Sequence, residues 1–241
     1  MSSLSGHVCL ISGGGSGIGA GIAGKFAVEG ASVAICGRRT EPLSLLAEKM
    51  RDQGGQVLAI PGDVSLEEDV ERIVAQTQAA FGPITILVNN AGISGGQPIH
   101  DHGVERWDRI LAVNLRGPFL LARAVLPGMR SMRSGHILQI SSETSLRHYA
   151  GSGAYGVSKH ALNALSEYIQ KENQDYGIRV DTICPGMVVT EMTRGRPNLN
   201  EDLCLYPEDI AELAHFLVTR RANIKIGTPV LIQTMDNPWQ K

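Results

Sequence analysis

The stretch "HVCLISGGGSGIG" (residues 7–19) joins an apolar run to a turn that carries five glycines. Glycine costs conformational entropy in a folded segment, so such a density indicates a tight turn or the close approach of another group. The pattern predicts a strand that ends before Gly13 and a helix that begins at Gly17 and Gly19. Unpaired N–H groups at a helix N-terminus bind pyrophosphate well. A tight turn that binds nothing stays an alternative, because the spacing differs from G-x-G-x-x-G.

Short β-branched runs alternate with stretches of helical period along the rest of the chain. Strands are expected at residues 7–11, 31–36, 57–60, 84–88, 136–140, 178–183 and 229–233, and helices at 17–29, 41–53, 66–81, 104–132, 154–176 and 207–219. Nearly continuous apolar strands separated by helices are typical of a parallel sheet covered on both faces. We therefore expect a single doubly wound, Rossmann-like α/β domain over residues 1–241, with about seven parallel strands.

The composition of the chain limits the kinds of partner that we expect it to bind. The chain has 22 basic and 24 acidic residues, a formal charge of −2 and no long basic run, which argues against nucleic acid. The N-terminus shows no leader, and no run approaches the roughly 18 apolar residues of a membrane span, so a cytoplasmic protein without a membrane partner is expected. The four cysteines form no C-x-x-C pair and indicate buried, reduced thiols. His100 and His102 lack a nearby third ligand, so no metal is expected.

The end of the second expected strand, "AICGRR" (residues 34–39), bears on the choice of dinucleotide. NAD sites usually place a carboxylate there for the adenosine ribose, whereas this chain has Gly37 followed by Arg38 and Arg39. Two guanidinium groups can pair with a 2′-phosphate, which favours NADP(H) over NAD(H). Solvated loop charges are the alternative. A P-loop match at residues 19–26 is rejected, because Phe26 replaces the hydroxyl that magnesium needs.

Tyr155 and Lys159 stand four residues apart at the start of an expected helix, which puts phenol and ammonium on one face. A free tyrosine has a pKa near about 10, and a fixed cation nearby lowers that pKa by favouring phenolate. Such a tyrosine can exchange a proton with an alcohol oxygen while hydride moves at the adjacent carbon. Upstream, Ser141 and Ser142 end a strand, and the hydroxyl of either could hold the substrate oxygen.

Asn114 lies within the long expected helix, four residues before Pro118. Proline has no N–H, so the Asn114 carbonyl loses its helical partner and could hold a water molecule. An asparagine merely tolerated at a bent helix is the alternative. The periodicity predicts one buried apolar stripe on this helix, formed by Leu111, Leu115, Phe119, Ala122 and Leu126.

Taken together, the motifs resemble those of the short-chain dehydrogenase/reductase family, and the resemblance covers roughly residues 5–220. They are the glycine-rich turn at Gly13, Gly17 and Gly19, "DV" at Asp63 and Val64, "NNAG" at residues 89–92, the helix asparagine Asn114, the strand-end Ser142, Tyr155 with Lys159, and "PG" at Pro185 and Gly186 followed by Thr190.

The resemblance implies roles for these residues. Tyr155 would be the acid/base, and Lys159 would lower its pKa and bind the nicotinamide ribose. Ser142 rather than Ser141 would orient the carbonyl, because it lies 13 residues before Tyr155. Asn114 would hold a water that links Lys159 to solvent. The catalytic set is thus Asn114, Ser142, Tyr155 and Lys159.

The resemblance also implies a cofactor site, in which Asp63 would contact adenine, Asn90 the adjoining ribose and Thr190 the carboxamide side. The full expected set is Gly13, Gly15, Ser16, Gly17, Ile18, Gly19, Arg38, Arg39, Asp63, Val64, Asn90, Gly92, Tyr155, Lys159, Pro185, Gly186, Val188 and Thr190.

The implied activity is NADP(H)-dependent interconversion of a ketone and a secondary alcohol, in the manner of 3-oxoacyl-thioester and carbonyl reductases. A substrate loop is expected at about residues 187–207, and its shortness suggests an open pocket for bulky carbonyls. A homo-oligomer, dimer or tetramer, is expected, although the unusual C-terminal tail with Trp239 casts doubt on the usual tetramer contact. A non-catalytic NADP(H) sensor or scaffold on the same fold is the alternative function.

Overall fold

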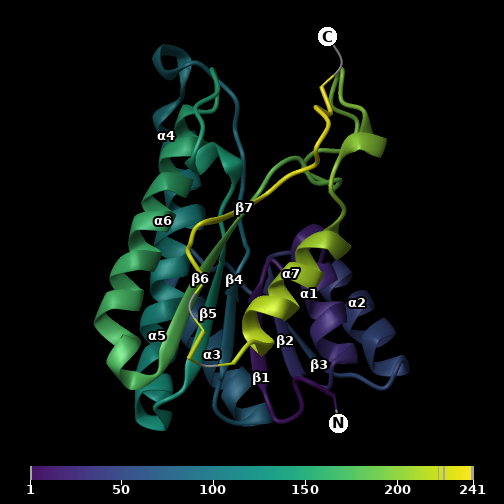
Figure 1. The fold of residues 1–241 in the computed structure, drawn as a ribbon, viewed down its shortest axis with the longest axis vertical. Coiled ribbons are helices and arrows are strands. Elements are labelled where there is room, and N and C mark those ends of the chain that lie inside the picture. Colours follow the sequence, from purple (N-terminus) through teal and green to yellow (C-terminus); the bar gives the residue numbers. More distant parts are fainter. Residues whose placement is uncertain (1, 222, 225, 240–241) are drawn as a thin grey trace.

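The computed structural model describes residues 2–221, 223–224 and 226–239, so both ends of the expected 1–241 domain lie outside the described residues. Its centre is one seven-stranded parallel sheet in the order β3-β2-β1-β4-β5-β6-β7 (Figure 1). The strands are β1 (Val8–Ser12), β2 (Ser32–Gly37), β3 (Gln56–Pro61), β4 (Ile86–Asn89), β5 (Gly135–Ile140), β6 (Ile178–Pro185) and β7 (Val230–Ile232). The predicted α/β fold class and the seven parallel strands are confirmed.

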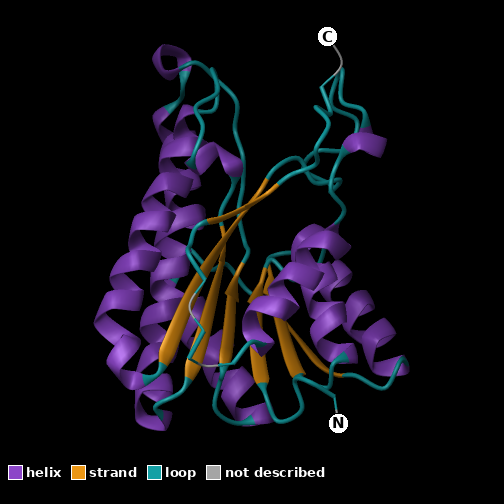
Figure 2. Cartoon of the chain, viewed as in Figure 1, coloured by secondary structure: helices purple, strands orange, loops and turns teal. Residues whose placement is uncertain are grey.

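Helices cover both faces of the sheet (Figure 2). One face carries α1 (Gly17–Val28), α2 (Thr40–Asp52) and α7 (Pro207–Thr219), and the other carries α3 (Glu67–Phe81), α4 (Val104–Leu111), α5 (Gly117–Met132) and α6 (Gly153–Asn173). Short helical turns are η1 (Ile99–Asp101), the π-helical η2 (Ala112–Arg116), η3 (Glu143–Ser145), η4 (Gln174–Tyr176) and η5 (Glu201–Leu203).

The central strands are mostly apolar because both of their faces pack against helices. In β1 every residue is buried: Cys9 and Ile11 belong to the core under α1 and α2, whereas Leu10 belongs to the core under α3 and α5. This arrangement explains why the strand sequences show continuous rather than alternating hydrophobicity. All four cysteines are free and buried, as expected from their positions.

The helical run Val104–Met132 corrects two expectations. Its most apolar window has a mean hydropathy of 1.3 and is long enough for a membrane span, so the expectation that no such run exists was wrong. Half of that window is buried inside the protein, as in a core helix. The predicted stripe was also wrong for most of its members, because Phe119 is 45% exposed and Leu111, Leu115 and Leu126 are only partly buried, whereas Ala122 is buried as expected. The helix is apolar on two sides, and periodicity alone does not tell which side faces the sheet. The buried side carries Val113, Leu120, Leu121, Val125 and Met129.

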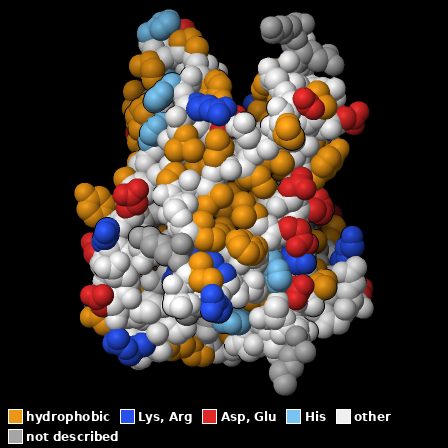
Figure 3. Space-filling model, in the orientation of Figure 1, with side chains coloured by type: hydrophobic (Ala, Val, Ile, Leu, Met, Phe, Trp, Pro, Cys, Tyr) orange, Lys and Arg blue, Asp and Glu red, His pale blue; other side chains and the backbone are white. Residues whose placement is uncertain are grey.

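The site is positioned by the loops beyond the carboxyl edge of the sheet. The segments after β4 and β5 rise on one side of this edge, and the segment after β6 rises on the other side together with the C-terminal tail (Figures 1 and 2). Figure 3 shows a hollow between these two projections. The carboxyl edge of an open parallel sheet is where such folds bind ligands.

Candidate active site

The glycine-rich turn between β1 and α1 packs closely on the segment after β4. Gly13 has a φ of 65°, and a Cβ atom there would lie 2.8 Å from Nδ2 of Asn90. That nitrogen donates to the carbonyl oxygens of Ser12 and Gly13, at 3.0 and 3.1 Å. At Gly17, whose φ is 53°, a Cβ atom would lie 3.1 Å from the methyl carbon of Thr190. Part of the glycine content therefore serves internal packing, and the expected contact of Asn90 with a ribose stays a prediction.

A cavity of about 190 Å³ lies beside this turn. It brings together eight residues of the expected cofactor set: Gly13, Gly15, Ser16, Arg38, Arg39, Asp63, Val64 and Gly92. Among the described residues that line it, Asp63 is the only acid, and the end of β2 carries Gly37 in place of a carboxylate. These features fit the adenosine end of a phosphorylated dinucleotide.

Asp63 has its carboxylate engaged within the protein. One oxygen accepts from the backbone N–H and the hydroxyl of Ser65, at 3.0 and 2.8 Å, and the other accepts from Arg109 at 2.5 Å. Burial raises the pKa of this carboxyl, but the hydrogen bonds from Arg109 and Ser65 prevail, so the net pKa is lowered. The expected contact with adenine stays a prediction.

The remaining members of the expected cofactor set do not line this cavity. Ile18 and Gly19 belong to the first turn of α1, where Ile18 packs against the core. Pro185 ends β6 and Gly186 follows it, with the Gly186 N–H donating to the Ile232 carbonyl at 2.7 Å. Val188 is bridged to Leu205, which closes the base of the loop that carries Thr190.

Asn114 sits in the π-helical turn η2, which leads directly into α5, where Pro118 lies in the first turn. Its side chain is fully buried and bonds the backbone of Ile93 in both directions, accepting from the N–H at 2.9 Å and donating to the carbonyl at 3.0 Å. It also donates to Ser158 at 3.0 Å, and Ser158 donates to the Tyr155 carbonyl at 2.6 Å. The asparagine thereby ties the segment after β4 to the start of α6.

Lys159 and Tyr155 occupy successive turns of α6. The ammonium of Lys159 is buried, donates to the Ile140 carbonyl at 2.8 Å and lies 5.7 Å from the centre of the Tyr155 ring. A Cβ atom on Gly92 would lie 3.6 Å from this ammonium and 3.5 Å from the amide oxygen of Asn114, so the three residues converge. Burial lowers the pKa of Lys159 to about 8.

The two serines that end β5 have different surroundings. Ser141 donates to the Lys159 carbonyl at 3.3 Å, and so supports the helix backbone. The Ser142 hydroxyl accepts from the Thr144 N–H at 3.2 Å, and it lies near enough to the phenol of Tyr155 to act to lower the pKa of the tyrosine. Asn114, Ser142, Tyr155 and Lys159 therefore meet at the carboxyl edge of β4 and β5.

The comparison with known proteins gives the family. The model of the short chain dehydrogenase family matches residues 7–200. The chain belongs to this family. An uncharacterised oxidoreductase of Staphylococcus aureus (strain USA300) is 33% identical over 227 residues, which cover 94% of this chain and 97% of the relative. An uncharacterised oxidoreductase of Staphylococcus saprophyticus is 34% identical over 228 residues, again 94% and 97% of the two chains.

Solved short-chain dehydrogenases share the fold over nearly their full length. A metagenomic short-chain oxidoreductase in complex with NADP has a TM-score of 0.84 and 32% identity, covering 97% of this chain and 98% of its own. A short-chain dehydrogenase/reductase from Serratia marcescens has a TM-score of 0.89 and 30% identity, with 96% and 98% covered. An alcohol dehydrogenase from the archaeon Thermococcus sibiricus, complexed with 5-hydroxy-NADP, has a TM-score of 0.88 and 26% identity, with 97% and 99% covered.

The titration of Tyr155 differs from the sequence-based expectation for this dehydrogenase. Burial raises the pKa of Tyr155, and this outweighs the lowering by the nearby Ser142 hydroxyl and by the charge of Arg196. The expectation that the neighbouring lysine leaves the tyrosine with a lowered pKa is therefore wrong for the protein by itself. The reason is that enclosure of the phenol disfavours phenolate more strongly than the surrounding groups favour it.

Sequence reasoning missed several residues that build the site of this dehydrogenase. The Ser12 hydroxyl accepts from the N–H groups of Asn90 and Ala91, both at 3.1 Å, and so joins the ends of β1 and β4. Glu191 pairs with Arg39 at 2.6 Å. A serine directly after an apolar run indicates the role of Ser12. No local pattern indicates that Arg39 pairs with Glu191, because the two residues are 152 positions apart.

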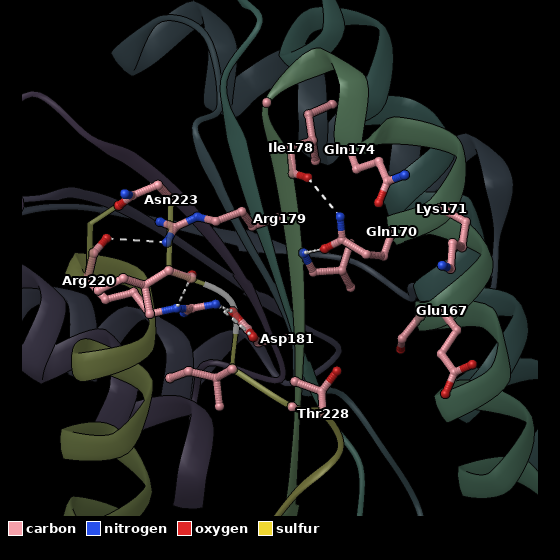
Figure 4. Close-up of a pocket in the computed structure, with 16 residues that line it drawn as sticks. Glu167, Gln170, Lys171, Gln174, Ile178, Arg179, Asp181, Arg220, Asn223 and Thr228 are labelled. Carbon is pink, nitrogen blue, oxygen red and sulfur yellow. Dashed lines mark hydrogen bonds and ion pairs between the residues drawn. The ribbon is translucent and has the colours of Figure 1, made fainter.

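A second cavity of the dehydrogenase, about 470 Å³, lies far along β6 from these residues and contains none of the expected site (Figure 4). Arg220, which follows α7, donates to both carboxylate oxygens of Asp181 at 2.9 and 2.7 Å. From α6, Gln170 accepts from the Val180 N–H at 2.7 Å and donates to the Ile178 carbonyl at 3.2 Å. These contacts give hydrogen-bond partners to groups at the outer edge of β6, and they hold the sheet to its helices. In the described part of the chain, no group of three or more His, Cys, Asp or Glu residues could hold a metal.

Proposed function

We propose that this short-chain dehydrogenase is an NADP(H)-dependent oxidoreductase that interconverts a ketone and a secondary alcohol, and that it reduces 3-oxoacyl or other bulky carbonyl substrates. The observation that carries the proposal is the meeting of Asn114, Ser142, Tyr155 and Lys159 beside Gly92, which lines the cofactor cavity.

The residues present fit a phosphorylated dinucleotide. The turn between β1 and α1 offers N–H groups at a helix N-terminus for a pyrophosphate. Arg38 and Arg39 line the same cavity, with no acid at Gly37 to repel a 2′-phosphate. Two of the solved relatives hold NADP or a hydroxylated form of it, which supports the same preference here.

When bound, the nicotinamide ring would supply the hydride. Ser142 would orient the carbonyl oxygen of the substrate through its hydroxyl. Tyr155 would donate its phenol proton to that oxygen as the alcohol forms. Lys159 would hold the nicotinamide ribose, and Asn114 would hold the water through which the proton is replaced.

The raised pKa of Tyr155 keeps its phenol protonated at neutral pH, which is the form that reduction of a carbonyl needs. A phenol that stays protonated at neutral pH is ready to donate to a carbonyl oxygen, whereas oxidation of an alcohol needs phenolate as the base. The positive charge of an oxidised nicotinamide ring would lower this pKa and assist the reverse step.

The segment at residues 187–207 is proposed as the substrate loop of a single catalytic domain. Its base is closed by the Val188–Leu205 bridge, and its tip contacts the C-terminal tail through the bridge of Leu199 with Trp239. The loop and the segments after β4 and β5 border the open hollow of Figure 3. An open hollow supports bulky carbonyl substrates.

A cytoplasmic homo-oligomer is proposed as well. The outer face of the run from α4 through η2 to α5 presents Leu111, Leu115 and Phe119, which line an apolar surface pocket of about 500 Å³ together with Leu165 of α6. Exposed apolar surface of this kind supports association with another copy, dimer or tetramer. Four free cysteines support a reducing compartment.

The test is NADPH oxidation with a panel of ketones and 3-oxoacyl thioesters, comparing the wild type with Tyr155→Phe. Turnover should fall by about 10²-fold or more, because the proton donor is removed. Dinucleotide affinity, measured by NADPH fluorescence, should change little and shows that the variant is folded. Turnover that survives the substitution would remove Tyr155 from this role. If the wild type binds NADPH but turns over none of these substrates, the result would instead support the alternative of a non-catalytic NADP(H) sensor.

The cofactor preference is tested separately with Arg38→Ala. Loss of one guanidinium should weaken the binding of NADPH by about tenfold or more and leave the binding of NADH almost unchanged, because only NADPH carries the 2′-phosphate. Equal losses for both dinucleotides would contradict 2′-phosphate recognition.

A further inference from the structure

Arg39 joins three separate segments at the mouth of the cofactor cavity. It follows β2, and one terminal nitrogen lies 2.6 Å from a carboxylate oxygen of Glu191 in the loop after β6. The same nitrogen donates to the hydroxyl of Ser16 in the glycine-rich turn at 3.2 Å. An ion pair therefore links a residue that lines the cavity to the loop after β6.

The loop holds Glu191 in front of Arg39 through its own contacts. The preceding residue, Thr190, packs on Gly17 of the turn, and its N–H donates to the hydroxyl of Thr193 at 2.9 Å. At the base of the loop, the Val189 N–H donates to the Leu205 carbonyl at 2.8 Å. The carboxylate is thus positioned by a built loop rather than by a free chain.

We propose that Glu191 is a residue that determines cofactor specificity, because its carboxylate occupies the Arg39 guanidinium that an adenosine 2′-phosphate needs. This inference rests on the proposed function, in which Arg38 and Arg39 bind the 2′-phosphate. NADP(H) must displace Glu191 from Arg39, whereas NAD(H), which lacks that phosphate, leaves the pair intact.

The physical basis is competition between two anions for one cation. A phosphate and a carboxylate repel each other when both approach the same guanidinium, so binding of one weakens binding of the other. The side chains of Arg39 and Glu191 are 58% and 61% exposed, so breaking the pair leaves no buried charge without a partner. Exposed pairs contribute little, and the expected penalty on NADPH affinity is about three- to tenfold.

The pair also links the phosphate to the substrate loop. Displacement of Glu191 removes the contact between the loop and the adenosine side of the cavity, while the Val188–Leu205 bridge stays in place. The tip of the loop is therefore held differently with NADP(H) than with NAD(H).

The experiment measures binding of two adenosine fragments by calorimetry, at one fixed ionic strength. Adenosine 2′,5′-bisphosphate carries the 2′-phosphate and 5′-AMP does not, so neither hydride transfer nor the nicotinamide ring enters the readout. Glu191→Gln should bind the bisphosphate about three- to tenfold more tightly than wild type and should bind 5′-AMP within about twofold. NADPH and NADH should follow the same pattern.

Two further variants make the test specific. Glu208→Gln removes an exposed carboxylate from the first turn of α7 and should leave both affinities unchanged, which excludes an effect of net charge. In an Arg39→Met background, Glu191→Gln should give no gain for the bisphosphate, because the contested guanidinium is gone.

Unchanged or weaker bisphosphate binding by Glu191→Gln would overturn the inference, as would a gain that persists without Arg39. The proposed function fails differently, by equal binding of the two fragments to wild type together with no loss in Arg38→Ala. Tight, Arg38-dependent bisphosphate binding that ignores Glu191 would therefore reject the specificity role and leave the proposed cofactor intact.

Discussion

Two arginine–carboxylate pairs of this protein differ in almost every physical respect. Arg220 and Asp181 are 5% and 2% exposed and share two hydrogen bonds, whereas Arg39 and Glu191 are 58% and 61% exposed and share one. The first pair joins β6 to the end of α7, and the second joins the lining of the cofactor cavity to the loop after β6. The contrast teaches that one pair is part of the fold, while the other is free to exchange its carboxylate for a ligand anion.

Burial explains why the first pair cannot exchange partners. Asp181 also accepts from Nε2 of His136 at 2.6 Å, and Arg220 also donates from Nε to the Ile224 carbonyl at 3.0 Å. Removing one member would leave the others charged or polar in a dry interior. Arg39, by contrast, has water on most of its surface, so a new anion can replace Glu191 without stranding a charge.

The largest expected effect is the loss of stability caused by Asp181→Ala. This change strands the buried Arg220 guanidinium and removes the acceptor of His136, so the free energy of unfolding should fall by about 3–5 kcal/mol. Urea denaturation followed by far-UV circular dichroism measures it.

The matched change at the exposed pair, Glu191→Ala, serves as the control. Its loss should stay below about 1 kcal/mol, because both side chains remain solvated. Similar losses in the two variants would refute the distinction between a structural and an exchangeable pair.

A smaller effect is expected from pH, through His136. Burial lowers the pKa of His136, outweighing the nearby Asp181 carboxylate, while the charges of Arg179 and Arg220 act in the lowering direction too. The folded protein therefore keeps this histidine neutral at a pH where the unfolded chain, with a pKa of about 6.5, takes up a proton. Stability should consequently fall as pH drops below about 6.5.

The measurement compares urea midpoints of the wild type and His136→Asn between pH 7 and pH 5. Wild type should lose about 1–2 kcal/mol more than the variant over this range. Asp181 does not contribute there, because its pKa is lowered and its stabilisation is lost only as pH falls through more acidic values. Parallel slopes for the two proteins would contradict a neutral buried histidine.

The fold could be predicted from the sequence because the patterns that indicate it are local. Each strand is a short apolar run, each helix follows a turn, and the glycine-rich stretch from Gly13 to Gly19 marks the first strand-to-helix junction. The buried face of α5 was not readable, since Phe119 and Leu121 are equally apolar and only packing separates them.

The candidate site could be predicted from the sequence only in part. Tyr155 and Lys159 share one helix, so their closeness follows from helical spacing, and the position of Ser142 follows from the end of a strand. The raised pKa of Tyr155 depends on how completely the fold encloses the phenol, which no short pattern encodes. The meeting of Arg39 with Glu191 depends likewise on how a loop folds back over the sheet.

The smallest expected effect is the response of the two pairs to salt. Raising the NaCl concentration from about 0.05 to 0.5 M shortens the screening length from more than 10 Å to a few ångströms, and weakens exposed pairs far more than buried ones. Salt should thus erase most of the small stability difference between wild type and Glu191→Gln, while the large deficit of Asp181→Ala persists. Urea denaturation at both salt concentrations gives the two differences. If the deficit of Asp181→Ala shrank in proportion with that of Glu191→Gln, solvent would reach both pairs alike, and burial could not be what separates the fixed arginine from the exchangeable one.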